Sequence, residues 1–352
     1  MKKIAIYPFS KDFLNNEMFN LNSLLNRDNN LMCWVQIKDN LKNMGIELNT
    51  IDLYNDLNEV DCFLFCSFDP GWYYKIPKRK KCIYIAFEPE VVDYRHSKKN
   101  LTKMLRYFDI VLTWNDDIVD QNRIMKFMYP FYFEKKWKNL DATQYANMKL
   151  LTCISGNKKS KHPKELYSER LKVINYFDNN AKFSLYGVGW DAKEHPSYRG
   201  KVLDKTETYH KYKFALCLEN ERNVKGYITE KILDCFCAGI VPIYKGAENI
   251  GEYIPEDCFI NYDSFDSISE MEKYISNIDY EGYLKYRVAM NEFLESKKRQ
   301  IFEAKSFTKA VCNAMQKKAM DYKCFGKNKL SKILMVIRSK MILVIRDIKN
   351  KL

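Results

Sequence analysis

The stretch that decides the fold is "ENERNVKGYITEKILDCFCAGIVPIYKG", residues 219–246. The apolar run "KFALCL" comes directly before it and predicts a buried strand that ends at Glu219. Thr229 stands as an N-cap before a helical segment that Gly239 ends, and "IVPIY" at 240–244 predicts the next strand. A strand, a helix and a second strand in this order indicate a βαβ unit within a parallel sheet.

The start of this helix gathers polar groups of opposite charge. Glu230 and Lys231 fall in its first turn, beside backbone N–H groups that have no partner within the helix. Such a terminus attracts anions, and Lys231 adds a charge suited to a diphosphate, whereas a carboxylate accepts hydrogen bonds from sugar hydroxyls. The mixture fits a nucleotide-sugar. The alternative is that Glu230 complements the helix dipole, Lys231 is solvated, and Glu219 with Asn220 forms a turn.

The same alternation of strands and helices extends along the chain. Helical spacing occurs over 31–44, which Gly45 closes, over 163–177, and from 271 to about 321. The order indicates an α/β protein of two doubly wound domains facing a cleft, with a polar linker at 129–148. Short apolar runs rich in β-branched and aromatic residues predict the other strands, at 3–7, 62–68, 82–87, 108–114, 149–155 and 182–187.

The composition agrees with a folded protein of this size. The 352 residues are 46% hydrophobic, enough for a substantial core, and the length favours two domains. Apolar runs fall short of the roughly 18 to 20 residues that cross a bilayer, and the start does not resemble a signal peptide, so we expect a cytosolic protein. Eleven cysteines without a CxxC pair predict buried, reduced thiols. The four histidines lie too far apart for a local metal motif.

The charge has several interpretations. A formal net charge of +13 is typical of proteins that bind nucleic acid, an anionic membrane or a phosphorylated ligand. Residues 327–352 carry eight Lys and Arg against one acid, and their apolar residues recur at helical spacing. This pattern predicts a basic amphipathic tail helix that lies on an anionic bilayer, the alternative being a final helix packed on protein. The G-x-G-x-x-G and Walker patterns are absent, which argues against the commonest dinucleotide and NTPase sites.

Several motifs of the sequence together resemble those of a known enzyme family. The segment "YKFALCLENERNVKGYITEKILDCFCAGIVPIYKG", residues 212–246, resembles the donor-binding signature of glycosyltransferase family 10, the α1,3/4-fucosyltransferases, here of the bacterial type. "AFEPE" at 86–90, "FDIVLTWNDD" at 108–117 and the segment 155–177 are similar to further parts of the family, in the same order. The likeness spans about residues 80–265.

The resemblance implies a fold and a reaction. The fold would be two Rossmann-like domains facing a cleft (GT-B type): an acceptor domain over 1–148 and a GDP-fucose domain over 149–326, followed by the tail at 327–352. Fucose would pass to a glycan hydroxyl with inversion, and Glu88 matches the general base. The matched donor-binding residues are Arg170 for the diphosphate, the pair Glu219 and Asn220, and the "GYITEK" residues Tyr227, Thr229, Glu230 and Lys231.

The resemblance also guides expectations about cofactors and partners. Arg170 and Lys231 are cations that stabilise a leaving diphosphate, so we expect no required metal, with metal stimulation left open. The expected partners are GDP-fucose, a glycan acceptor with a Gal-GlcNAc-type unit and the inner face of the plasma membrane, but no nucleic acid. Two alternatives remain at this stage: a transferase of the same fold that uses another GDP-sugar or UDP-sugar, and a non-enzymatic protein that binds nucleic acid or membrane.

Overall fold

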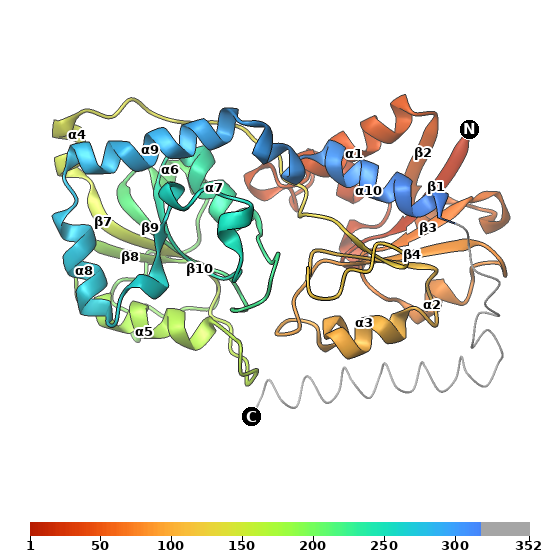
Figure 1. Cartoon of the computed structure of the whole chain (residues 1–352), viewed down its shortest axis with the longest axis horizontal. Helices are drawn as coiled ribbons and strands as arrows, with labels where there is room; N and C mark the ends of the chain where they lie inside the picture. Colours follow the sequence, from red (N-terminus) through yellow and green to blue (C-terminus); the bar gives the residue numbers. More distant parts are fainter. Residues whose placement is uncertain (318–352) are drawn as a thin grey trace. The chain divides into compact units, whose positions relative to one another are not determined.

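The computed structural model describes residues 1–317, which form two compact units (Figure 1). Unit 1 consists of residues 1–130 and the helix that begins at Ala304, and unit 2 of residues 131–303. The predicted tail at 327–352 lies outside the described residues.

Unit 1 is built on one parallel sheet of six strands in the order β2-β1-β3-β4-β5-β6. The strand order changes direction at β1, because β2 lies on one side of it and β3 to β6 follow on the other. In open α/β sheets, ligands usually bind at the carboxyl ends of the strands where the order changes direction in this way. In Figure 1, α1 and α10 lie over one face of this sheet and α3 lies over the other. The strands are β1 (Lys2–Tyr7), β2 (Ile46–Thr50), β3 (Cys62–Phe65), β4 (Lys81–Ala86), β5 (Ile110–Thr113) and β6 (Ile124–Lys126), and the helices are α1 (Met32–Asn43), α2 (Pro70–Tyr73), α3 (Lys98–Met104) and α10 (Ala304–Gln316).

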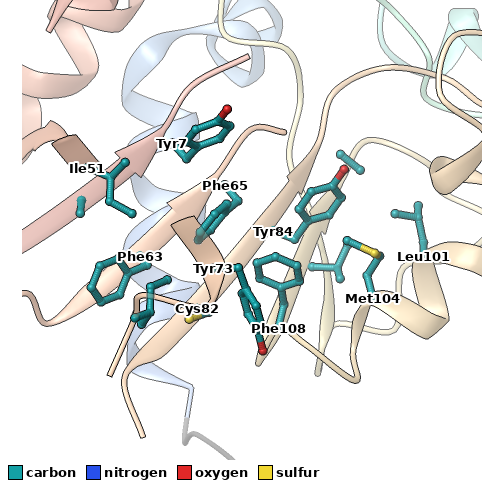
Figure 2. Packing of buried hydrophobic residues seen from close by; sticks show 14 of the residues in the cluster. Tyr7, Ile51, Phe63, Phe65, Tyr73, Cys82, Tyr84, Leu101, Met104 and Phe108 are labelled. Carbon is teal, nitrogen blue, oxygen red and sulfur yellow. The ribbon is translucent and has the colours of Figure 1, made fainter. Parts of the chain in front are cut away.

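The core beneath α2 and α3 is rich in aromatic side chains, which Figure 2 shows at close range. Alternate residues of each strand point to this face, so Phe63 and Phe65 of β3 lie beside Cys82 and Tyr84 of β4 respectively. The rings of Phe65 and Phe108 meet edge to face with their centroids 5.4 Å apart. Burial on both faces holds β4 firmly, and the chain leaves this strand toward Glu88.

Unit 2 contains a second parallel sheet, of five strands in the order β11-β10-β9-β7-β8. β9 is the central strand, with β10 on one side and β7 on the other, so its carboxyl end lies at the middle of the sheet edge. The strands are β7 (Lys149–Ile154), β8 (Phe183–Tyr186), β9 (Tyr212–Leu218), β10 (Val241–Lys245) and β11 (Ile260–Asn261), and the helices are α4 (Ala142–Asn147), α5 (Tyr167–Phe177), α6 (Lys205–Tyr209), α7 (Glu230–Ala238), α8 (Ile268–Asn277) and α9 (Tyr280–Glu295).

The predicted α/β class with parallel sheets is confirmed, and all eight predicted strands are present. The structure adds three strands that the sequence analysis did not predict, β2, β6 and β11. β6 and β11 are short strands at the outer edges of their sheets. β2, with the sequence "IELNT", alternates buried and half-buried residues instead of forming an apolar run.

The contacts divide the chain differently from the predicted ranges 1–148 and 149–326. The division falls after Pro130, and α10 returns to unit 1. Phe307 and Val311 of α10 are buried, and the ring of Phe307 meets that of Trp34 on α1 at a centroid distance of 5.7 Å. Helical periodicity identifies a buried face but not the sheet that covers it, which is why the sequence could not assign this helix.

Three further properties concern the described residues only. Ten cysteines within residues 1–317 are buried and free. No helix in this part of the chain is long and apolar enough to cross a membrane. No group of three or more His, Cys, Asp or Glu side chains in the same part is placed to hold a metal ion.

Candidate functional site

A buried carboxylate lies at the centre of the site. Glu219 directly follows β9 and is fully buried. Its carboxylate accepts hydrogen bonds from the backbone N–H of Thr229 at 2.9 Å and from the Thr229 hydroxyl, whose oxygen lies 2.8 and 2.9 Å from its two oxygens. Lys231 Nζ completes the cluster at 2.8 Å from Oε2. Burying a carboxylate is costly unless it is paired and hydrogen-bonded, and here both conditions are met.

Local sequence determines where α7 begins and ends. Thr229 has the extended backbone of an N-cap, and Gly239 closes the helix in the left-handed conformation, with φ 77°. Ile232, Leu233 and Phe236 bury the opposite face, which orients the first turn toward the end of β9. The predicted cap, helix and C-terminal glycine are confirmed.

Lys231 is held as a cation. Burial alone would lower its pKa, but the nearby carboxylates of Glu219 and Glu230 outweigh burial and raise the pKa above its usual value. Glu230 Oε1 lies 3.8 Å from Lys231 Nζ, and the Glu230 side chain is 51% exposed. The interpretation of Lys231 as a solvated surface residue is therefore wrong, because its ammonium group pairs with a buried carboxylate.

Arg170 of α5 lies against the same strand end. The side chain is buried, and Nη2 donates to the carbonyl of Leu218 at 2.6 Å and to that of Glu219 at 3.1 Å. Within residues 1–317, its Nε and Nη1 have no hydrogen-bond partner, and the guanidinium carbon lies 5.6 Å from the centre of the Tyr167 ring. Arg170 of α5 and Lys231 of α7 thus both bind groups at the carboxyl end of β9.

The loop between β9 and α7 places two more of the predicted residues. Tyr227 is buried, and Asn220 Nδ2 donates to its hydroxyl oxygen at 3.3 Å. Gly226 takes the left-handed conformation, with φ 80°, and its N–H donates to Asn249 Oδ1 at 2.8 Å. This contact ties the loop to the segment that follows β10.

Sequence reasoning missed the role of Gly246, which follows β10. A Cβ atom at this position would lie 2.5 Å from Glu219 Cγ and 2.6 Å from the Tyr244 hydroxyl oxygen, closer than real Cβ contacts. The glycine therefore lets the β10 loop close over the buried carboxylate. The signal in the sequence was the glycine that follows the predicted strand in "IVPIYKG", where the chain leaves the sheet.

Glu88, the predicted base, lies in unit 1, whereas all the predicted donor-binding residues lie in unit 2. It stands two residues beyond β4 and is exposed. The carbonyl of Phe87 accepts hydrogen bonds from Trp114 Nε1 at 2.7 Å and from the Tyr129 hydroxyl. The carbonyl of Glu88 itself is bonded to His96 Nδ1. Hydrogen bonds to the carbonyls of Phe87 and Glu88 thus fix the backbone on both sides of the Glu88 Cα atom.

The comparisons with known proteins bear on this geometry. A family model described as "Glycosyltransferase family 10 (fucosyltransferase) C-term" matches residues 147–331, more than half of the chain. The chain belongs to glycosyltransferase family 10. The matched segment includes β9, α7, β10 and every predicted donor-binding residue.

The family's curated members are similar over a limited region. The mouse 4-galactosyl-N-acetylglucosaminide 3-alpha-L-fucosyltransferase 9 is 36% identical over 123 residues, which are 33% of this chain and 32% of that protein. The Alpha-(1,3)-fucosyltransferase FucT of Helicobacter pylori is 36% identical over 74 residues, 21% of this chain and 15% of that protein. The chain thus spans about a third or less of the length of these curated relatives.

Solved structures agree with the fold over nearly the whole chain. An alpha1,3-fucosyltransferase with GDP-fucose superposes with a TM-score of 0.52 and 16% identity, covering 92% of each chain. An alpha-glucosyltransferase in complex with UDP and DNA reaches a TM-score of 0.55 at 14% identity, covering 90% of this chain and all of that one. At this identity the likeness concerns the fold, which is the GT-B type that the resemblance implied.

Proposed function

We propose that this chain transfers fucose from GDP-fucose to a hydroxyl group of a glycan, with inversion at the anomeric carbon. The observation that carries the proposal is the paired-charge cluster of Glu219, Thr229 and Lys231 at the carboxyl end of β9, beside Arg170. It lies in the segment that matches the family. A nucleotide-sugar needs fixed cations for its diphosphate and acceptors for its hydroxyl groups; Arg170 and Lys231 offer the cations, and the exposed carboxylate of Glu230 in the first turn of α7 offers an acceptor.

Each donor-site residue has a distinct task in the proposal. Lys231 and Arg170 neutralise the diphosphate, assisted by the N-terminal N–H groups of the nine-residue α7. Glu230, whose carboxylate is half exposed, accepts hydrogen bonds from sugar hydroxyls. Glu219 is too deeply buried to meet the ligand in this structure, so we assign it to positioning Thr229 and Lys231.

The loop residues Asn220 and Tyr227 complete the proposed donor site. Their mutual hydrogen bond at 3.3 Å links the two ends of the loop, which joins the strand end that holds Arg170 to the cap of α7. The proposal places them beside the nucleotide-sugar, as the family resemblance implies for Tyr227.

The proposed chemical step uses Glu88 as general base. The carboxylate accepts the proton of the acceptor hydroxyl while that oxygen attacks the anomeric carbon of fucose. The bond from this carbon to the diphosphate oxygen breaks, and its electron pair leaves with GDP. Arg170 and Lys231 stabilise the charge that grows on the leaving group, so the proposal requires no metal ion and leaves stimulation by one to experiment.

The acceptor that we propose is a GlcNAc or Glc hydroxyl within a Gal-GlcNAc-type unit of a surface polysaccharide. The name of the mouse relative, a 4-galactosyl-N-acetylglucosaminide 3-alpha-L-fucosyltransferase, supports this class of acceptor. The proposed location is the cytoplasmic face of the plasma membrane, with residues 327–352 as the contact to anionic lipid. Flotation of the full chain with anionic liposomes at low and high salt tests the location, because an electrostatic contact weakens with salt.

A donor screen tests the activity directly. Purified protein is incubated with GDP-fucose, GDP-mannose or a UDP-sugar and an array of Gal-GlcNAc disaccharides, and released nucleotide and product are both measured. We expect GDP release and product formation with GDP-fucose alone, and a product anomer opposite to that of the donor. Transfer from another nucleotide-sugar would replace the proposal with the same-fold alternative. No transfer at all, with salt-sensitive oligonucleotide binding, would favour the non-enzymatic alternative.

A further inference from the structure

A buried histidine and a buried tyrosine lie directly behind the predicted base. Tyr84 of β4 is completely buried and His96, which ends a single helical turn after Asp93, is 6% exposed. The Tyr84 hydroxyl lies 2.8 Å from His96 Nε2, and the rings meet at 61° with centroids 5.7 Å apart. The other ring nitrogen, Nδ1, is bonded to the carbonyl of Glu88.

The chemistry of the partners determines where the protons lie. A carbonyl oxygen only accepts, so Nδ1 of His96 carries a hydrogen and donates it to Glu88. In a neutral imidazole Nε2 is then an acceptor, and the phenol of Tyr84 donates to it. The result is a chain of two hydrogen bonds from Tyr84 through His96 to the backbone carbonyl of Glu88, in which each donor faces an acceptor.

The surroundings of His96 keep this neutral form at neutral pH. Burial lowers the pKa of His96, and the charge of Asp93 and the Glu88 carbonyl only partly oppose this effect. Asp93 Oδ2 lies 3.8 Å from Nε2, but the Asp93 carboxylate is bound by the guanidinium of Arg95, whose Nε is 2.8 and 2.9 Å from its two oxygens. Asp93 is therefore committed to Arg95, and Tyr84 is the nearest partner of Nε2.

From this arrangement we infer that His96, held in its Nδ1–H form by Tyr84, is a positioning residue for Glu88. The inference rests on the proposed function, in which Glu88 removes a proton. The carbonyls on both sides of the Glu88 Cα atom are occupied, that of Phe87 by Trp114 and Tyr129 and that of Glu88 by His96. An exposed carboxylate on a fixed backbone loses less entropy when it meets an acceptor hydroxyl than one on a mobile loop.

The test compares variants that differ in one hydrogen bond. His96→Leu removes the donor to Glu88, His96→Asn keeps an N–H donor close to the position of Nδ1, and Tyr84→Phe removes the group that fixes the ring. Tyr73→Phe is the matched control, because it deletes another buried phenol of unit 1 that donates to a backbone carbonyl, that of Tyr107 at 2.9 Å. The measurements are kcat and KM for fucosyl transfer, the Kd for GDP and thermal unfolding.

We expect His96→Leu to lower kcat about 10- to 100-fold, the range for a small misplacement of a reacting group, with the Kd for GDP unchanged. His96→Asn should recover most of the rate, Tyr84→Phe should lower kcat severalfold, and Tyr73→Phe should leave it unchanged. Long-range proton–nitrogen NMR spectra at pH 7 should show wild-type His96 protonated at Nδ1 only. A His96→Leu enzyme with wild-type kcat, or a His96 protonated at Nε2, would overturn the inference.

A double variant separates this inference from the function on which it rests. In a Glu88→Gln background, His96→Leu should add almost nothing, because the group that it positions is already lost. If the two effects multiply instead, His96 acts on stability and the positioning role is wrong, although Glu88 remains the base. If Glu88→Gln transfers fucose at the wild-type rate, or the protein transfers none, the proposed function fails and the inference fails with it.

Discussion

Removing the Lys231 ammonium group should lower both the stability of the protein and its affinity for GDP, and the two effects can be separated. Lys231→Met deletes the ammonium group that lies 2.8 Å from the Glu219 carboxylate and leaves that fully buried group with only the donors of Thr229. Breaking a buried ion pair by removing one partner typically costs about 3 to 5 kcal/mol. Because the Lys231 side chain is 28% exposed, water reaches part of the pair, and we expect the lower end, about 3 kcal/mol.

A matched double variant separates the effect on stability from the effect on GDP affinity. Glu219→Gln with Lys231→Met removes both charges but keeps an oxygen acceptor for Thr229, so most of the lost stability should return. Replacing a buried ion pair by neutral groups is often close to neutral for stability. Affinity for GDP should not return, since the diphosphate has lost a cation whose charge-assisted hydrogen bond contributes about 1.5 to 3 kcal/mol.

Both quantities are measurable on the same samples. Urea unfolding, followed by a probe in unit 2, reports stability, and calorimetric titration with GDP reports affinity. A Lys231→Met protein as stable as the wild type would refute the buried pair as a source of stability. Recovery of GDP affinity in the double variant would refute the assignment of Lys231 to the diphosphate.

Four further predictions follow from the same geometry. Gly246→Ala should destabilise unit 2 and weaken GDP binding, because the added methyl group meets Glu219, and thermal unfolding with GDP titration measures both. Arg170→Lys keeps a charge but loses the forked contacts, so the Kd for GDP should rise roughly tenfold by calorimetry. Glu88→Gln should leave GDP binding intact and lower transfer by about two to four powers of ten, and a near-normal rate would assign the base elsewhere. The pKa of His96 is lower in the folded than in the unfolded protein, so as pH falls the unfolded chain takes up the proton at a higher pH. The free energy of unfolding should therefore decrease as pH drops below about 6.5, the usual pKa of histidine, and His96→Asn should weaken this pH dependence in urea unfolding.

Several features were determined by the sequence alone because they depend on near neighbours in the chain. The cap at Thr229, the helix after it and its end at Gly239 follow from side chains and backbone groups within a few residues, and the structure has them where they were predicted. The apolar runs of both sheets were equally visible, since a strand buried on both faces is apolar throughout. The long motif at 212–246 also sufficed to indicate the family.

Tertiary structure decided which of these pieces meet. Arg170 lies 48 positions before Leu218 in the chain, and only the fold brings its guanidinium, on α5, to that carbonyl at the end of β9. The burial of Glu219, which changes its assignment from a ligand contact to a support for Lys231, depends on the loop at Gly246 closing over it. The link from Tyr84 through His96 to Glu88 depends on the packing of one turn against β4. Such contacts join residues that are distant in the chain, and local sequence patterns do not predict which strand ends become neighbours.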